Sequence, residues 1–389
     1  MDLTLATPLL GGLSANTFMR RHWQKKPLLI RSAVPGGEAV VTRAQLFALA
    51  AQEAVESRLV VCAQAGWILR HGPFRRAALP PLKQPGWTLL VQGVDLRLGA
   101  ARALLERFRF VPDARLDDVM VSYASEGGGV GPHVDSYDVF LLQVQGRRRW
   151  RIGRVNDPAL LPDVPLKILA AFEPEQEWLL EPGDMLYLPP GWGHDGVAEG
   201  ECLTCSIGFR AAGREQIARD VLQRALDAAE PVDSDALYRD PKQPATDAPG
   251  RIPPALQAFA ADAVARLLAT PRWLGCALGE VLSEPKPGVW FETATGTVEG
   301  GAGGGVGGVG GVGGVSLDRR SRMLYDDWHV FINGESFQAA GRDATLMRGL
   351  ADRRLLSARE LAALSPPARE LLDDWVAAGW VLHAGVAAK

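Results

Sequence analysis

The chain has 389 residues, 47% hydrophobic and 22% charged, which is an ordinary composition for a globular protein of two or three domains. Its formal net charge of −3 gives no indication of general affinity for nucleic acid, and a basic partner would need a local acidic patch. No apolar run reaches the length of a membrane helix, and the N-terminus lacks the basic start of a signal peptide. Four cysteines are too few for a disulfide scaffold of this size, so the sequence predicts a reducing, cytoplasmic location.

The first 95 residues mix predicted helices with short strands. A helix is expected after a cap at Ser14 or Asn16, and the chain breaks at Pro27 before the apolar run LLI. The stretch TRAQLFALAAQ predicts a second helix, and GWTLLVQGVD predicts a strand that ends in a turn. We interpret residues 1–95 as a region that completes the domain following it.

A helix at about 98–108 precedes a clear change of pattern. Short runs rich in β-branched and aromatic residues follow, separated by Gly, Pro and Asp: DDVMVSYAS, YDVFLLQVQG, RRRWRIGRV, EWLLEPGDMLYL and CLTCSIGFR. Strands at such close spacing favour an all-β sandwich or barrel over residues 96–212. Cys202 and Cys205 form a CxxC in the last run, but an offset of three puts them on opposite faces of a strand, which argues against a zinc or redox site.

Residues 213–270 turn helical again. The stretch EQIARDVLQRAL is amphipathic, which fits either packing on the barrel or contact with a second chain. Residues 271–389 contain the glycine-rich tract 300–315, which predicts a flexible insertion without a chemical role. A strand pair around Asn333-Gly334, helices and a last strand then indicate a winged-helix-like domain. Its arginines are interspersed with acidic residues, so we expect no direct DNA binding.

His133 and Asp135 are the first residues that indicate chemistry. Side chains two apart in an extended segment share a face, although an HxD alone is more often surface polarity. His194 follows a predicted strand and the rigid corner PPG, and it supplies a third ligand. Two histidines and one carboxylate form the facial triad of non-haem Fe(II) oxygenases, which leaves positions open for a cosubstrate and dioxygen.

The arginine triplet follows a predicted turn at Gly146. Alternation places Arg148 on one face with Trp150 and Ile152, so this face should point into the barrel. The arginines on the opposite face are interpreted as a solvated face: Arg147, Arg149 and Arg151. A buried guanidinium is costly unless an anion pairs with it, and no acidic residue on the neighbouring runs is an obvious partner. A carboxylate ligand held by the fork of Arg148 would meet this need.

The stretches GPHVDSYDVFLLQVQGRRRW and LEPGDMLYLPPGWGH resemble the JmjC-type 2-oxoglutarate oxygenases, in particular the bacterial ribosomal oxygenases. The stretches FMRRHWQKKPLLIRSA, IGFRA and DDWHVFINGESF extend the resemblance over nearly the whole chain apart from the glycine tract. The resemblance implies an α+β chain with a double-stranded β-helix (cupin/JmjC) barrel, N-terminal α/β elements, a helical dimerisation segment and a C-terminal winged-helix-like domain. It therefore also implies a homodimer.

The resemblance further implies that His133, Asp135 and His194 bind Fe(II), with 2-oxoglutarate as cosubstrate and O2 as oxidant. Arg148 would hold the distal carboxylate of 2-oxoglutarate, in agreement with the strand alternation. Ser122 would add a hydrogen bond to that carboxylate, unless it is an ordinary strand serine. The remaining histidines are expected to be structural or surface residues: His22, His71, His329 and His383.

Four residues match positions around the substrate side chain in the resembled family: Asp118, Met120, Tyr137 and, as a weaker match, Ser206. A guanidinium is recognised by a carboxylate and by flat aromatic or thioether surfaces, which these residues offer. Asp117 should point away from this pocket. The family hydroxylates an arginine in a large-subunit ribosomal protein, the sixteenth of the bacterial series. A ribosomal histidine hydroxylase and a non-oxidative metal-binding cupin remain alternatives, although the inward Arg148 argues against the cupin.

Overall fold

The computed structural model describes residues 2–34, 40–63, 66–227, 237–241, 244, 250–268, 271–292 and 313–383. The chain divides into two compact units, Met1–Ala211 and Ala212–Lys389, which are described separately. Most of the predicted glycine-rich insertion, residues 300–312, lies outside the described residues. The finer predicted boundaries after residues 95 and 270 stay predictions.

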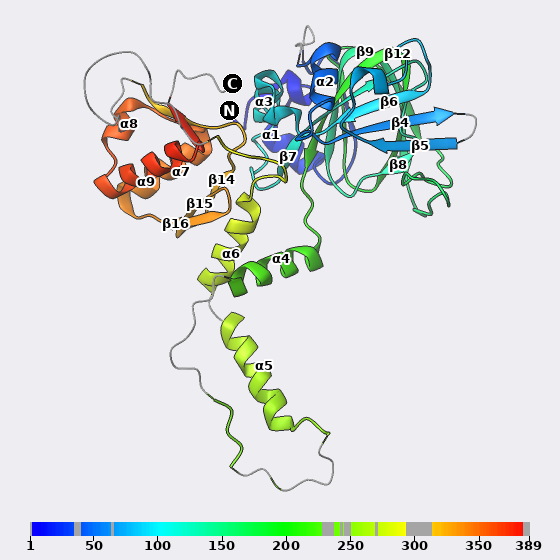
Figure 1. Cartoon of the computed structure of the whole chain (residues 1–389). Helices are drawn as coiled ribbons and strands as arrows, with labels where there is room; N and C mark the ends of the chain where they lie inside the picture. Colours follow the sequence, from blue (N-terminus) through cyan, green and yellow to red (C-terminus); the bar gives the residue numbers. More distant parts are fainter. Residues whose placement is uncertain are drawn as a thin grey trace. The chain divides into compact units, whose positions relative to one another are not determined.

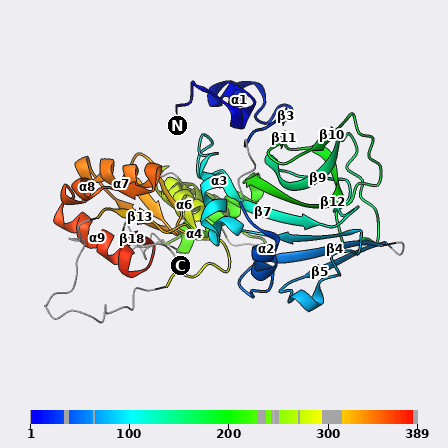
Figure 2. The ribbon, with the colours of Figure 1, turned by 90° about the horizontal axis from the view of Figure 1, so that it is seen from above.

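One large antiparallel sheet forms the barrel of the first unit (Figure 1). Its strand order is β3-β11-β9-β12-β7-β6-β4-β5, with β10 paired to β9 and β8 paired to β12. The strands are β3 (Leu28–Ile30), β4 (Ser57–Ala63), β5 (Gly66–His71), β6 (Trp87–Val91), β7 (Leu116–Ala124), β8 (His133–Val134), β9 (Val139–Arg154), β10 (Gln176–Leu180), β11 (Met185–Leu188) and β12 (Trp192–Phe209). Figure 2 shows β3, β10 and β11 on one side of the barrel and β4, β5 and β7 on the other.

Helices and short strands complete this unit at its N-terminal end. The elements are β1 (Ala6–Thr7), β2 (Leu13–Ser14), α1 (Ala15–Arg21), α2 (Arg43–Ala50) and α3 (Gly99–Glu106), with three 3-10 turns at Pro8–Leu10, Arg76–Ala78 and Val94–Leu96. The Ser14 hydroxyl accepts a hydrogen bond from the Thr17 amide at 3.2 Å and so caps α1, which makes Ser14 and not Asn16 the cap of the two that the sequence offered. The buried ring of Phe18 on α1 lies edge-on to Tyr187 of β11, with 4.9 Å between ring centroids. This contact holds the first helix on the barrel.

The two longest strands, β9 and β12, pair along most of their length and form the wall that carries the predicted site. The prediction of a turn at Gly146 is wrong, because Gly146 lies inside β9. Its φ of +63° is left-handed, and a Cβ there would lie 2.1 Å from the Glu201 carbonyl oxygen. The β9–β12 pairing is irregular between Glu199 and Leu203. The glycine therefore marks a bulge that bends a continuous strand rather than ending it.

The second unit begins with α4 (Arg214–Asp227), α5 (Pro254–Leu268) and α6 (Pro271–Ser283). The sequence did not predict α6, whose Gly279 faces the ring of Phe331 on β15 (His329–Ile332). A Cβ at Gly279 would lie 2.2 Å from that ring, so the glycine that weakens the helical pattern is needed for close packing. None of the described helices combines the length and hydropathy needed to cross a membrane.

The rest of the second unit has two small sheets, β17-β13-β18 and β14-β15-β16, beside three helices. The elements are β13 (Val315–Leu317), β14 (Met323–Tyr325), β15 (His329–Ile332), β16 (Glu335–Gln338), α7 (Gly341–Arg353), β17 (Leu355–Leu356), α8 (Ala358–Ala362), α9 (Pro366–Ala377) and β18 (Val381–His383). Asn333 and Gly334 join β15 to β16 with φ of 51° and 91°, as expected of a tight hairpin turn. This part of the second unit has its own hydrophobic core, and Leu350 and Trp375 are among the side chains buried in it.

Candidate metal centre and cosubstrate pocket

The three predicted metal ligands lie together on the barrel wall. Strand β8 pairs with β12 so that His133 lies directly opposite His194, and their ring centroids are 4.1 Å apart. The His194 Nε2 atom is 3.6 Å from Asp135 Oδ2. One ligand atom from each of the three residues lies within 4.8 Å of the others. The arrangement matches a two-histidine, one-carboxylate site for a divalent metal such as iron.

Both histidines are oriented by backbone carbonyls. His133 Nδ1 lies 2.9 Å from the Gly131 carbonyl oxygen, and His194 Nδ1 lies 3.1 Å from that of Trp192. Because a carbonyl only accepts, each Nδ1 carries the proton and each Nε2 keeps its lone pair for a metal. Burial lowers the pKa of His194 well below its usual value, and His133 nearby lowers it further. His194 is therefore held in the neutral form that a metal ligand requires.

The third ligand, Asp135, is also removed from water. Burial raises the pKa of its carboxyl group, while His133 and a hydrogen bond from the Tyr137 hydroxyl act in the opposite direction. A bound cation would add a much larger stabilisation of the carboxylate than these neighbours do. The donor set and its orientation therefore fit Fe(II).

Arg148 of β9 points into the barrel, as the alternation with Trp150 predicts, and is only 3% exposed. Its Nη1 donates to the hydroxyls of Ser122 at 3.1 Å and Thr204 at 3.4 Å, and its Nη2 donates to the Gly196 carbonyl at 3.1 Å. The guanidinium carbon lies 5.0 Å from the centroid of the Trp150 ring. Neutral oxygens and one aromatic ring thus hold this buried cation.

No carboxylate within the described part of the chain forms an ion pair with Arg148. Its Nε atom and the indole nitrogen of Trp150 are both buried without a hydrogen-bond partner. Burial accordingly lowers the pKa of Arg148 from its usual value. A buried cation with an unused donor is stabilised by an anionic oxygen ligand, so these residues fit the distal carboxylate of a dicarboxylic acid such as 2-oxoglutarate.

Asp118 lies on β7, four residues before Ser122 and on the same face of the strand, and is 2% exposed. Its Oδ2 accepts hydrogen bonds from Gln92 Nε2 at 2.8 Å and from the Gly93 amide at 2.9 Å. Asp117 points away, as expected: its carboxylate lies 3.3 Å from Arg210 Nε, and its side chain is 36% exposed. Neighbouring aspartates on one strand therefore have opposite environments.

The other predicted substrate residues lie near Asp118. Met120 is the cross-strand partner of Ser206, so their side chains share a face of the sheet. Tyr137 is 38% exposed and donates its hydroxyl to Asp135. Burial raises the pKa of Tyr137, and the negative charges of Asp135 and Asp118 raise it further. The fold thus groups the predicted substrate residues beside the metal ligands, although their roles stay predictions.

The outward arginines are not simply solvated, which corrects the sequence interpretation. Arg149 forms ion pairs with Glu177 at 2.7 Å and with Glu199, while Arg151 pairs with Asp195. Arg147, which is 54% exposed at its side chain, lies 3.9 Å from Glu199. The outer face of β9 therefore carries a ladder of ion pairs that alternation alone could not predict, because the acidic partners come from β10 and β12.

Sequence reasoning missed Thr204, which accepts a hydrogen bond from Arg148 and donates one to Gln143 at 3.0 Å. A signal was present, because Thr204 is two residues from Ser206 and shares its strand face. Gln143 gave no such signal. It is fully buried, and its role depends on β12 lying beside β9.

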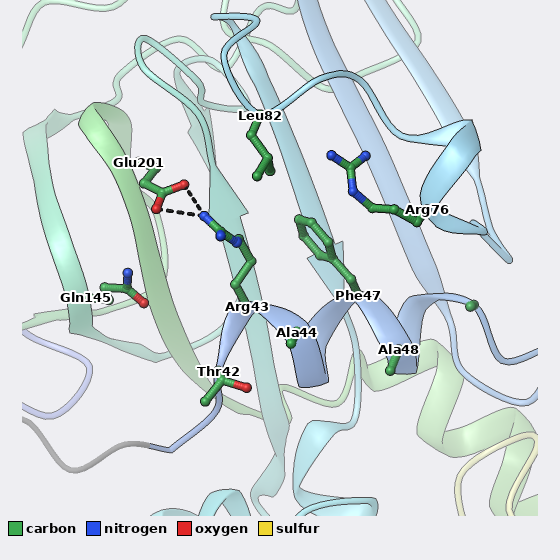
Figure 3. Close-up of a pocket in the computed structure, with 10 residues that line it drawn as sticks. Thr42, Arg43, Ala44, Phe47, Ala48, Arg76, Leu82, Gln145 and Glu201 are labelled. Carbon is green, nitrogen blue, oxygen red and sulfur yellow. Dashed lines mark hydrogen bonds and ion pairs between the residues drawn. The ribbon is translucent and has the colours of Figure 1, made fainter.

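A separate pocket of about 720 Å³ lies against α2. Its lining residues are Thr42, Arg43, Ala44, Phe47, Ala48, Ala51, Arg76, Leu82, Gln145 and Glu201. Figure 3 shows Arg43 reaching toward Glu201, 2.6 Å away, with Phe47 between Arg43 and Arg76. None of the predicted metal, cosubstrate or substrate residues lines this pocket.

Comparisons with known proteins agree with this geometry. Residues 103–217 match the family model of the JmjC domain, and residues 310–381 match that of the ROXA-like winged helix. The chain is 35% identical over 274 residues to the ribosomal protein uL16 3-hydroxylase of Escherichia coli, covering 69% of this chain and 71% of that protein. This chain belongs to the bacterial ribosomal oxygenases.

Solved structures of ribosomal oxygenases extend the similarity to the whole fold. The X-ray structure of E. coli ycfD superposes with a TM-score of 0.80 at 28% identity, covering 95% of this chain and 98% of that chain. A structure of the same E. coli protein in complex with cobalt and 2-oxoglutarate has a TM-score of 0.74 at 29% identity, with 96% and 99% covered. The predictions of a JmjC-type barrel and a winged-helix-like domain are therefore confirmed for this ribosomal oxygenase.

Proposed function

We propose that this ribosomal oxygenase uses Fe(II), 2-oxoglutarate and O2 to hydroxylate a side-chain carbon of an arginine in uL16, the sixteenth protein of the bacterial large subunit. The observation that carries the proposal is Arg148, a buried guanidinium that forms no ion pair with any described residue and lies on the same wall as the His133, Asp135 and His194 cluster. The E. coli relative named as a uL16 hydroxylase, and the complex of ycfD with cobalt and 2-oxoglutarate, support it. The cytoplasm, where ribosomal proteins are made, is the proposed location.

In this proposal one group of residues binds the iron and another binds 2-oxoglutarate. His133, Asp135 and His194 would hold the iron, which together with 2-oxoglutarate and O2 supplies the oxidising chemistry. Arg148 would bind the distal carboxylate of 2-oxoglutarate through its fork, and the hydroxyls of Ser122 and Thr204 would fix the orientation of that fork. The indole of Trp150 excludes water from one face of the guanidinium, which strengthens this ion pair.

The substrate end of the pocket fits a cationic, planar side chain. The carboxylate of Asp118 offers charge, while Met120 and Tyr137 offer a thioether and an aromatic surface for the flat faces of a guanidinium. Ser206, opposite Met120, would add a hydroxyl. This combination favours arginine over histidine as the target residue.

The direct test is mass spectrometry of large-subunit ribosomal proteins incubated with the enzyme, Fe(II) and 2-oxoglutarate. We expect the mass of one oxygen atom to be added to an arginine of uL16, and only when 2-oxoglutarate is present. Modification of a histidine would replace arginine as the target residue. Binding of 2-oxoglutarate without any oxidation of protein would favour the non-oxidative cupin.

Asp118 and Asp117 form a matched pair of test positions. Replacing Asp118 by asparagine should raise KM for the arginine substrate roughly 30-fold or more, since losing one partner of a desolvated charge pair costs about 2–5 kcal/mol. Asp117→Asn should have little effect, because Asp117 lies outside the pocket in an exposed pair with Arg210. Steady-state kinetics on both variants measure the difference. Equal effects would remove the reason for choosing arginine over histidine.

We also propose that the helices of the second unit make the enzyme a homodimer. Large apolar side chains on α4 and α5 are exposed, each by 37% or more: Leu222, Leu226, Leu256, Phe259 and Val264. Leu222 and Leu226 are four residues apart and so form one stripe on α4. A second copy of the same helix would cover this stripe, consistent with the amphipathic pattern of the sequence.

Charge on the α4 stripe should separate the two chains. The double variant Leu222→Glu/Leu226→Glu is expected to be monomeric at concentrations where the natural protein is dimeric, because it would bury four carboxylates at a two-fold interface. Sedimentation equilibrium measures the change. Gln216→Glu, at an exposed position nearly two turns earlier, is the control and should stay dimeric. A monomeric natural protein, or a dimeric double variant, would contradict the proposal.

A further inference from the structure

Arg58 of β4 lies beside the predicted substrate residue Met120, although no motif pointed to it. The strand registers pair Arg58 with Leu90 of β6, and Leu90 with Ser122 of β7. Residues paired in this way share one face of the sheet, so Arg58 lies on the same face as Ser122. Its Nη2 atom contacts Met120 Sδ at 3.8 Å and Gln92 Oε1 at 3.5 Å. The guanidinium is therefore next to the predicted substrate residues.

Arg58 is a half-buried cation whose charge acts on the nearby carboxylate of Asp135, but within the described residues it forms no ion pair at contact distance. Other arginines of the barrel, such as Arg43, Arg149 and Arg151, each have an acidic partner. A guanidinium that loses water without gaining an anion or an oxygen acceptor is unfavourable. A polypeptide that covers the pocket would remove more water from Arg58. Binding is then favourable only if the polypeptide supplies an oxygen acceptor.

Gln92 lies between Arg58 and Asp118 and forms a hydrogen bond with each of them. Its amide oxygen accepts from Arg58, and its amide nitrogen donates to Asp118 Oδ2 at 2.8 Å. The neutral side chain of Gln92 therefore links the guanidinium of Arg58 to the carboxylate of Asp118. A substrate arginine beside Asp118 would have its guanidinium near the carboxylate. The main chain of the substrate would then pass close to the guanidinium of Arg58.

We propose that Arg58 is a substrate-binding residue that donates hydrogen bonds to an oxygen of the substrate chain, either a main-chain carbonyl or a carboxylate beside the target residue. The proposal rests on the proposed function in that the substrate is a ribosomal protein. Asp118 and Arg58 then recognise two different parts of that protein, a cationic side chain and an oxygen acceptor. This pair of opposite charges fixes the direction in which the chain crosses the pocket.

The test uses the full-length enzyme and recombinant uL16. Arg58→Met keeps the length of the side chain and removes its charge. We expect KM for uL16 to rise about 10- to 100-fold, the equivalent of one charge-assisted hydrogen bond, with kcat little changed. KM for 2-oxoglutarate should stay the same, because Arg148 holds that molecule. Arg58→Lys should restore part of the loss, since it keeps the charge but not the fork.

Arg70→Met is the matched control. Arg70 pairs with Leu59, the neighbour of Arg58, so its side chain is on the opposite face of the same sheet. It should leave both KM values unchanged. An unchanged or lowered KM for uL16 in Arg58→Met overturns the proposal, as does a rise confined to KM for 2-oxoglutarate.

A variant that already carries Asp118→Asn separates direct binding from an effect through Gln92. Arg58→Met should raise KM for uL16 in this background by a similar factor, because the two residues bind different parts of the substrate. Loss of the effect would mean that Arg58 acts only by holding Gln92 and Asp118, which overturns the proposal. If the enzyme oxidises a ribosomal protein at a residue other than arginine, the proposed target is wrong, and the same measurements on that protein still decide the role of Arg58.

Discussion

Replacing His133 by alanine is expected to abolish both the hydroxylation of substrate and the succinate production coupled to it. His133 is one of three ligands whose donor atoms lie within 4.8 Å of one another, and no further His, Cys, Asp or Glu in the described chain joins this cluster. Even residues that only orient a ligand cost about 10–100-fold in metal affinity or activity when lost. Removal of a ligand should therefore reduce turnover by at least ~100-fold.

Thermal unfolding with and without metal gives an independent measurement. Metal binding stabilises the folded state by mass action, so Fe(II) or Mn(II) should raise the Tm of the natural protein but not of His133→Ala. The control is His71→Ala, at an exposed position of β5, which should keep both turnover and the metal-dependent rise in Tm. Full turnover in His133→Ala would exclude His133 as a ligand.

Replacing Arg148 by methionine should remove the binding of 2-oxoglutarate while leaving the metal site intact. Two hydrogen bonds from a guanidinium to a carboxylate contribute about 1.5–3 kcal/mol each, so the affinity should fall roughly 100-fold or more. The metal-dependent rise in Tm should persist, because none of the three ligands is changed. Titration of 2-oxoglutarate into Mn(II)-loaded protein measures the effect.

Arg148→Met should also separate stability from activity. In the natural protein the buried Arg148 forms no ion pair with the described residues, and removing this cation removes a desolvation cost. The same change takes a donor from the Gly196 carbonyl, so the two effects oppose each other and the Tm without ligand should change little. Only the natural protein should gain about 2.7 kcal/mol of stability from 2-oxoglutarate at 100 times its Kd. If Arg148→Met bound 2-oxoglutarate as tightly as the natural protein does, another cation would have to hold the distal carboxylate of 2-oxoglutarate.

The alternation of one strand was enough to predict the environment of Arg148. Hydrophobic residues at Trp150 and Ile152 set the phase of β9, and a strand has only two faces. Spacing was enough to place His133 and Asp135 on one face of a short segment, whereas their role as ligands was predicted only together with His194 and the family resemblance. The cap of the first helix and the hairpin turn at Asn333 are also local, which is why the sequence predicts them.

Features that depend on the pairing of distant segments were not predictable in this way. The ion-pair ladder joins Arg149 and Arg151 to acidic residues of β10 and β12, and a single strand does not reveal its neighbours. A glycine such as Gly146 is typical of a turn. Here the pairing with β12 becomes irregular at the bend, and β9 continues beyond it. Arg58 lies in a region without any motif, and only the sheet order β7-β6-β4 brings it to the pocket.

Three identical residues in a row, Arg147, Arg148 and Arg149, would let β9 slide by one position and still present an arginine to the interior. Such a slide turns every side chain of the strand over. Trp150 lies directly opposite Gly196 of β12, where a Cβ would be 2.6 Å from the indole ring. Only the absence of a side chain there makes room for the indole. The space that Gly196 leaves on the neighbouring strand therefore fixes the register of β9 during folding. The register in turn determines which of the three arginines faces the cosubstrate.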